Sequence, residues 1–139
     1  SMLTREELPD FVEKKLEQGS MKTVPQCVNE PVPLGNENCI KYQSLEKLDN
    51  GKSYKVLDLG QNIGDDTQDF IIGDDEYFFL GDNRDNSLDS RFDRQFGGVG
   101  LVSKEYLIGK ASLILFSSRG SSIFYFWTWR KDRFFKVIR

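Results

Sequence analysis

The sequence predicts a mainly β protein, and three observations indicate this class. Short apolar stretches alternate with turn-forming residues along most of the chain. An Asn-Gly pair separates two segments that both read as strands. A chain of 139 residues has the usual length of one domain, and no repeat is visible in it.

A short helix is expected in the N-terminal region. Thr4 and Glu7 have the spacing of a capping box, and residues 10–18 can form a short helix. Residues 19–39 contain several prolines and asparagines and are predicted to form a loop. The apolar side chains that the helix would turn inward are Phe11, Val12 and Leu16.

A β-hairpin is predicted around residues 49–51. Residues 41–48 and 52–59 read as its two strands, and Asn50-Gly51 would supply the two positive φ angles of a type I′ turn. Residues 60–69 are rich in Gly and Asp and are expected to be a loop.

Two further strands are expected later in the chain. Residues 76–80 contain three consecutive aromatic residues followed by Leu80, which predicts a buried strand that runs into a polar turn. Residues 106–117 are largely apolar and β-branched, with the single charge of Lys110, and are also strand-like.

The overall charge and the absence of histidine exclude several functions. A net charge of −3, with 29% charged residues, gives no indication of a nucleic-acid partner. The chain has no histidine, so the commonest metal ligand and the usual general base are missing. No metal and no cofactor is therefore predicted.

The two cysteines, Cys27 and Cys39, leave two alternatives open. They can close a surface loop as a disulfide, which implies an oxidising compartment, or they can be two unrelated free thiols. No apolar run approaches the about 18–20 residues that span a bilayer, and no signal peptide is visible. Because Ser1-Met2 also reads like a cloning scar, we expect a truncated piece of a larger exported protein.

Residues 81–91 carry most of the functional information. Their sequence is Gly-Asp-Asn-Arg-Asp-Asn-Ser-Leu-Asp-Ser-Arg. Asx side chains fix tight turns, and arginines form forked hydrogen bonds with carboxylates, so a rigid polar cluster is expected at the end of a strand. The pairs expected are Arg84 and Arg91 with Asp85 and Asp89. The alternatives are a solvated turn or a calcium loop, although Ser90 and Phe96 break the EF-hand pattern.

This segment resembles the Gly-Asp-Asn-Arg-Asp-Asn-Ser-x-Asp-Ser-Arg signature of bacterial type I signal peptidases at every defined position. Residues 98–102 and 107–111 are similar to the strands that follow in this family, with Ser103 where a proline is usual. The hairpin and the Cys27/Cys39 loop resemble alphaproteobacterial members.

The resemblance implies a serine endopeptidase that removes signal peptides from exported preproteins at the outer face of the bacterial inner membrane. A serine is the nucleophile and a lysine of lowered pKa is the general base. By position, Ser87 would hydrogen-bond that lysine, and Asp89 and Arg91 would brace the segment. The full supporting set that the resemblance implies is Gly81, Asp82, Asn83, Arg84, Ser87, Asp89 and Arg91.

Neither member of the catalytic dyad is expected in this chain, so the chain alone is predicted to be inactive. Residues 19–22 read Gly-Ser-Met-Lys, but Ser20 lacks the residues that flank the nucleophile in the family. Lys104 and Lys110 offer no better base.

The resemblance divides the chain into three parts. Residues 1–75 would be an accessory insert, 76–118 the last strands of the catalytic β-core, and 119–139 an aromatic and basic tail near the membrane. In the tail, Phe124 and Phe126 alternate as on a buried strand face. One alternative for the whole end is a core strand over residues 124–129 followed by a helical tail with Phe134, Phe135 and Ile138 packed inward, whereas we favour a position at the membrane surface for the rest of the tail. The membrane-facing residues expected are Trp127, Trp129, Arg130 and Lys131.

The partners implied are signal peptides and the inner-membrane surface, and exposed strand edges could also pair two copies into a dimer. Two other hypotheses remain. One is a periplasmic β binding module whose Asx-rich, possibly calcium-binding loop is the ligand site. The other is a catalytically dead homologue that serves as a scaffold.

Overall fold

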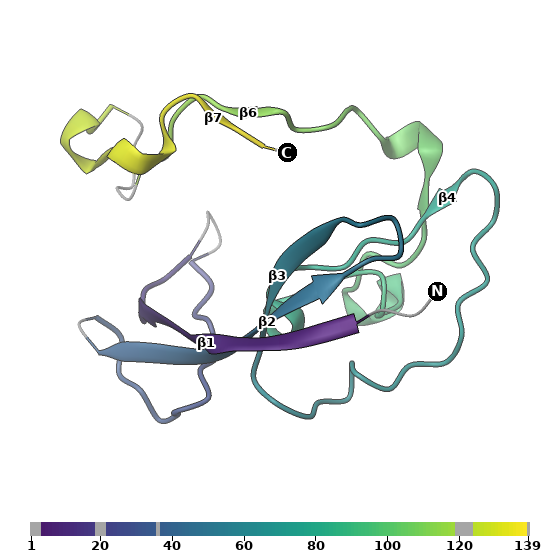
Figure 1. Cartoon of the computed structure of the whole chain (residues 1–139), viewed down its shortest axis with the longest axis horizontal. Coiled ribbons are helices and arrows are strands. Elements are labelled where there is room, and N and C mark those ends of the chain that lie inside the picture. The colour runs from purple at the N-terminus through teal and green to yellow at the C-terminus, as the bar shows by residue number, and fades with distance from the viewer. Residues whose placement is uncertain (1–3, 19–21, 36, 119–123, 139) are drawn as a thin grey trace. The chain divides into compact units, whose positions relative to one another are not determined.

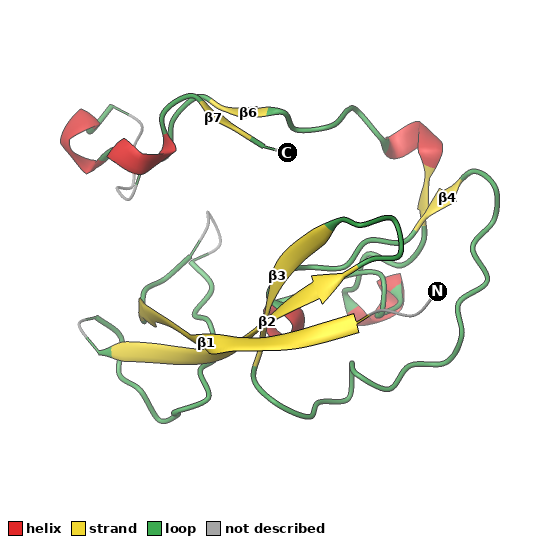
Figure 2. Cartoon of the chain, viewed as in Figure 1, coloured by secondary structure: helices red, strands yellow, loops and turns green. Residues whose placement is uncertain are grey.

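The computed structural model describes residues 4–18, 22–35, 37–118 and 124–138. Figures 1 and 2 show that these residues form strands, loops and single helical turns, which confirms the mainly β class. The chain divides into two compact units, Ser1–Lys104 and Glu105–Arg139. Among the described residues there is no helix with the length and apolar character needed to span a bilayer.

The first unit is organised by a three-stranded antiparallel sheet. Its strands are β1 (Thr4–Lys14), β2 (Asn38–Lys47) and β3 (Ser53–Asp58), in the order β1-β2-β3. The pairing of β1 with β2 shifts register between Leu8 and Phe11. Pro9 lies at this irregularity, where a residue without an N–H group does not interrupt regular pairing.

The predicted helix at residues 10–18 is wrong, because β1 occupies most of this segment. Glu13 of β1 forms an ion pair of 2.6 Å with Lys41 of β2, whose side chain is fully buried. Val12 and Leu16, which the helix would have turned inward, are exposed. Pairing with a distant strand therefore overrides the local helical pattern.

The predicted hairpin is confirmed, but its turn is not type I′. Leu48 C=O accepts a hydrogen bond of 2.9 Å from Gly51 N–H, and Leu48 N–H donates to Lys52 C=O at 2.8 Å. Gly51 has a φ of 79°, whereas Asn50 is absent from the described non-glycine residues of positive φ. The loop is thus a three-residue connection that ends in a left-handed glycine.

A disulfide joins Cys27 to Cys39, the first of the two alternatives for these cysteines, with a Cα–Cα distance of 5.2 Å. It connects the 22–35 loop to β2, and Val28 N–H also donates to Ile40 C=O at 2.8 Å. Both cysteines are buried and, with Val56, form the small apolar core of the described residues.

The strand predicted at residues 76–80 is shorter and more exposed than expected. Only β4 (Glu76–Tyr77) pairs, with β5 (Val102–Ser103), and Phe79 and Leu80 are each 45% exposed. Ser90 makes the hydrogen bonds to the Phe79 backbone that a neighbouring strand would otherwise make. Its hydroxyl accepts the Phe79 N–H at 2.9 Å, and its own N–H donates to Phe79 C=O at 3.0 Å.

The second unit contains β6 (Leu113–Ile114) paired with β7 (Lys136–Val137). Only these two residues of the long strand predicted at 106–117 form a ladder. Residues 104–106, which span the boundary of the two units, form a single helical turn, η3 (Lys104–Tyr106).

The core strand and the helical end considered for residues 124–138 do not form in the described part of the chain. Phe124 and Phe126 are 81% and 69% exposed, and η4 (Phe126–Thr128) replaces the expected strand. The helical end is reduced to one turn, η5 (Lys131–Arg133), and Phe135 is exposed. Trp129 provides the local packing instead, because its ring stacks on Phe116 at 4.8 Å between centroids.

We predict that the disulfide contributes substantially to the stability of the first unit. Eleven residues lie between the cysteines, and closing such a loop should stabilise the fold by about 2–3 kcal/mol on the chain-entropy model. Urea unfolding with and without reductant should show this difference, and intact mass after alkylation should show no free thiol in the oxidised protein. A Cys27→Ser/Cys39→Ser variant is the control, since reductant should not change its midpoint. Two freely alkylated thiols in air-oxidised protein would contradict the prediction.

Candidate functional site

Residues 81–91 form a compact polar segment directly after the aromatic residues that follow β4. The segment contains the helical turn η1 (Arg84–Asn86), and its Asp89 and Ser90 are buried. It is also attached to the hairpin, because Leu57 N–H of β3 donates to Asp82 C=O at 2.7 Å and Leu57 bridges Asn83. The segment is therefore held by the sheet and does not form a solvated loop.

The pair of Asp89 and Arg91 lies at the centre of the segment. Arg91 Nε donates to Asp89 Oδ1 at 2.9 Å, and Arg91 Nη2 donates to Asp89 Oδ2 at 3.1 Å. Gly81 N–H donates to the same Oδ2 at 2.9 Å. The two side chains are only 5% and 8% exposed, so this bidentate pair is shielded from water. The predicted pairing of these two residues is confirmed.

The surroundings of Asp89 favour its ionised form. Burial is the largest single influence and would raise the pKa of this carboxyl. The hydrogen bonds from Arg91 and from the Gly81 and Arg91 backbone act in the opposite direction, and together they hold the pKa below its ordinary value. Asp89 is therefore a carboxylate whose two oxygens both accept hydrogen bonds from N–H groups.

Arg91 extends this network to two other parts of the unit. Its guanidinium donates to Gly64 C=O at 3.2 Å and also to Arg84 C=O. A single side chain thus ties together the 60–69 loop, the turn η1 and Asp89. Such a group restricts the conformations available to the whole segment.

Ser87 lies directly against Gly81. A Cβ atom at position 81 would come within 2.1 Å of Ser87 Oγ and 2.5 Å of Ser87 Cβ, so only glycine permits this approach. Within the part of the chain that the structure describes, the Ser87 hydroxyl makes no hydrogen bond, and the residue is half-buried.

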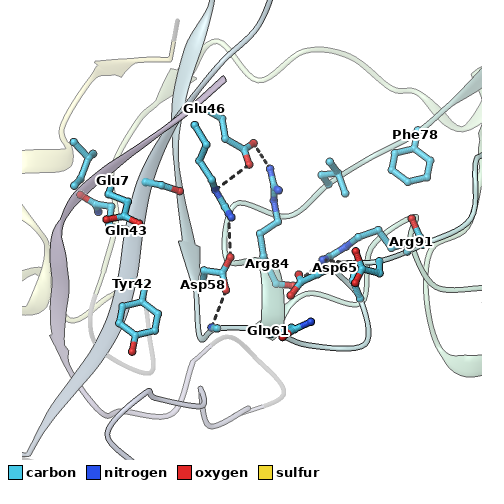
Figure 3. Close-up of a pocket in the computed structure, with 18 of the residues that line it drawn as sticks. Glu7, Tyr42, Gln43, Glu46, Asp58, Gln61, Asp65, Phe78, Arg84 and Arg91 are labelled. Carbon is cyan, nitrogen blue, oxygen red and sulfur yellow. Dashed lines mark hydrogen bonds and ion pairs between the residues drawn. The ribbon is translucent and has the colours of Figure 1, made fainter. Parts of the chain in front are cut away.

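The prediction for Arg84 and Asp85 is wrong, because these two residues do not pair with each other. Arg84 forms an ion pair with Glu46 of β2, as Figure 3 shows. Asp85 instead accepts the Leu59 N–H at 2.6 Å, and burial together with neighbouring carboxylates such as Asp58 raises its pKa. Glu46 was not identified from the sequence, since nothing in its local context relates it to residue 84.

Asn86 links the segment to the disulfide loop. Its Oδ1 accepts the Gln26 N–H at 2.8 Å, and its Nδ2 donates to Asn83 Oδ1 at 3.2 Å. Gln26 immediately precedes Cys27, so the disulfide loop, the hairpin and residues 81–91 form one connected structure.

A cavity of about 1110 Å³ opens beside this network (Figure 3). Its walls come from β1, β2, the 58–70 region and residues 78–91, and both Arg84 and Arg91 reach it. Among the described residues no group of three or more His, Cys, Asp or Glu side chains could hold a metal ion. Because the Asp89 oxygens are taken by N–H donors, they are poorly placed as calcium ligands.

The other predicted site residues belong to the second unit. Ser20, the rejected candidate for the nucleophile, lies outside the described residues. Trp127 is 68% exposed, while Trp129 packs on Phe116. Arg130 Nε lies 3.9 Å from Asp132, next to Lys131. All of these tail residues belong to the Glu105–Arg139 unit.

Comparison with known proteins gives a family for the chain. The family model described as "Signal peptidase, peptidase S26" matches residues 15–116, which is most of the chain. The "Signal peptidase I" of Rickettsia bellii (strain OSU 85-389) is 42% identical over 81 residues, covering 53% of this chain and 26% of that protein. That of Rickettsia typhi is 42% identical over 91 residues, covering 60% and 33%. No solved structure matches.

The family whose model matches most of the chain is a peptidase family. More narrowly, the chain belongs to the signal peptidase family, peptidase S26. This confirms the resemblance to type I signal peptidases, including its alphaproteobacterial character. The chain spans about a third or less of the length of the curated relatives it matches.

We predict that Asp89 makes the stability of the first unit depend on acid pH. Its folded pKa lies below its ordinary value of 3.8, so its contribution is fully present above that pH and is lost as the pH falls through the folded value. Urea midpoints measured from about pH 6 to about pH 2.5 should fall less steeply for Asp89→Asn than for the unmodified chain. Asp74→Asn removes an exposed carboxylate and should keep the original slope. An unchanged slope in Asp89→Asn would contradict the prediction.

Proposed function

We propose that this chain is part of a signal peptidase I that cleaves signal peptides from exported preproteins at the periplasmic face of the inner membrane. A serine nucleophile and a lysine general base would come from parts of the protein outside this chain. Residues 1–75 would form the accessory insert, 76–118 the end of the catalytic core and 119–139 the membrane-proximal tail. The observation that carries the proposal is the position of Ser87 in a rigid frame within a segment that matches the family signature.

The frame supports a positioning role for Ser87. Asp89 and Arg91 fix the Gly81 backbone, and Gly81 in turn sets the place of the Ser87 side chain. A lysine acts as a base only when its amine is neutral, which requires desolvation and a defined orientation. The Ser87 hydroxyl, half-buried and without a hydrogen bond among the described residues, is suited to orient such an amine. The supporting set remains Gly81, Asp82, Asn83, Arg84, Ser87, Asp89 and Arg91.

We predict that Ser87→Ala in the full-length enzyme lowers kcat by about 10–100-fold while KM changes little, because misplacing the base affects the chemical step. Steady-state cleavage of an Ala-x-Ala peptide measures both constants. Gly81→Ala should reproduce the defect, since its new methyl group must displace Ser87. Gly109→Ala is the matched control, because a Cβ there meets nothing within 4 Å.

Wild-type kcat in Ser87→Ala would show that the segment is only structural. The isolated chain should show no turnover above buffer in the same assay. Turnover by the chain that Ser20→Ala abolishes would mean that Ser20 is the nucleophile after all.

The second unit supports the membrane-surface part of the proposal. Phe124, Phe126, Trp127 and Phe135 all present exposed rings, and residues 130–139 add five Lys or Arg side chains. Aromatic rings favour the membrane interface, and each basic residue near an anionic surface adds about 1 kcal/mol. The combination is suited to a bilayer surface that carries anionic lipid.

We predict that the chain co-sediments with vesicles that contain anionic lipid and that deletion of residues 127–139 abolishes this binding. Trp127→Ala should weaken binding more than Trp129→Ala, because Trp127 is 68% exposed and Trp129 packs on Phe116. Neutral vesicles are the control for the basic residues. Equal binding by the intact and shortened proteins, or by neither, would show that the tail serves folding alone.

A further inference from the structure

Glu46 is a buried carboxylate whose partners come from three separate elements. It lies on β2 and its side chain is only 2% exposed. Arg84 of η1 pairs with its Oε2, and Arg5 of β1 lies with Nε 3.6 Å from its Oε1. Tyr54 stands opposite Glu46 in the β2–β3 register, and burial followed by a hydrogen bond with Glu46 raises the pKa of this tyrosine.

The contact with Arg84 places Glu46 at one end of a continuous network. The Arg84 carbonyl accepts a hydrogen bond from Arg91, and Arg91 holds Asp89 in a bidentate pair. Asp89 accepts the Gly81 N–H, and Gly81 is the residue against which Ser87 packs. The network therefore runs from the hairpin to Ser87 through hydrogen bonds and one close backbone contact.

Burial makes the connection at Arg84 energetically important. The Arg84 side chain is 13% exposed, and its Nε is buried without a hydrogen-bond partner in the described part of the chain. Glu46 is its ion-pair partner among the described residues. Removing one member of a buried pair leaves the other charge uncompensated, so without Glu46 the Arg84 side chain should leave its position.

We propose that Glu46 is a positioning residue for peptidase activity, which acts through Arg84 on the placement of Ser87. The hairpin formed by β2 and β3 would then set the geometry of the 81–91 segment, in addition to holding the 22–35 loop through the disulfide. The inference rests on the proposed function, and it adds a residue outside the 81–91 segment to the machinery.

The first experiment compares Glu46→Gln with Glu6→Gln in the full-length enzyme. Glu6 forms an exposed ion pair of 2.8 Å with Lys47 on the neighbouring strands, and such pairs contribute little. Glu46→Gln should lower kcat by at least about tenfold with KM changed less than about twofold, and Glu6→Gln should change neither. Wild-type kcat in a folded Glu46→Gln enzyme would overturn the proposal. No turnover by the unmodified enzyme would instead count against the proposed function.

The second experiment is independent of activity and uses this chain. Hydrogen exchange measured by mass spectrometry should show faster exchange of the Gly81 and Arg91 amides in Glu46→Gln, while the β2–β3 ladder amides keep their protection. Unchanged protection of these amides would overturn the proposal.

A third comparison covers the case in which Glu46→Gln alone does not fold. Arg84→Gln leaves the Glu46 carboxylate with Arg5 as its remaining ion-pair partner, and the double variant Glu46→Gln/Arg84→Gln removes both charges of the pair. Because Glu46 acts through Arg84, the double variant should lose no more kcat than Arg84→Gln alone. Losses that multiply would show that Glu46 acts by another route and would overturn the proposal.

Discussion

The bidentate pair of Asp89 and Arg91 is the interaction on which the first unit depends. Two charges are withdrawn from water within three residues, and such a pair is stable only when every remaining hydrogen-bonding group is also satisfied. The structure satisfies them with the Gly81 N–H and the carbonyls of Gly64 and Arg84. These three groups come from the end of the aromatic stretch that follows β4, a long loop and a helical turn. Satisfying one ion pair therefore fixes the relative positions of three segments that have few apolar contacts of their own.

The rest of the unit follows the same rule, because charged groups occupy positions that apolar side chains usually fill. Lys41 and Glu46 are as buried as Val56, and Lys15 pairs with Glu30 at 2.5 Å beside the disulfide loop. Buried ion pairs add little net stability, yet each one is costly to break. A small interior of this kind contributes little hydrophobic stabilisation. Its buried charges instead determine which residues must pair in the folded state. The Cys27–Cys39 disulfide then limits the conformations that the unfolded chain can adopt between these two residues.

Local chemistry explains which features could be predicted from the sequence. The hairpin, the compact 81–91 segment and the Asp89–Arg91 pair are encoded by neighbouring residues, so they were predicted. The strand β1 forms by pairing with β2, which lies well beyond it in the sequence, and Glu46 and Arg84 are 38 residues apart. No local sequence pattern carries information about partners at such distances. The buried strand expected at Phe124 and Phe126 did not form, for a related reason. Alternation at Phe124 and Phe126 predicts a strand only if a sheet receives it, and here Trp129 packs on Phe116 instead.

The two serines of the 81–91 segment differ in whether their hydroxyls already make a hydrogen bond. Ser90 is buried, and its hydroxyl accepts the Phe79 N–H, so it replaces a missing strand partner. Ser87 sits three residues earlier in the same frame, yet its hydroxyl makes no hydrogen bond within the described residues. If the segment were merely a polar turn, the short Ser87 side chain would be expected to bond its own backbone, as serines in turns commonly do. Its close approach to Gly81 instead fixes the side chain and leaves the oxygen available, which is the property that a group orienting a second side chain requires.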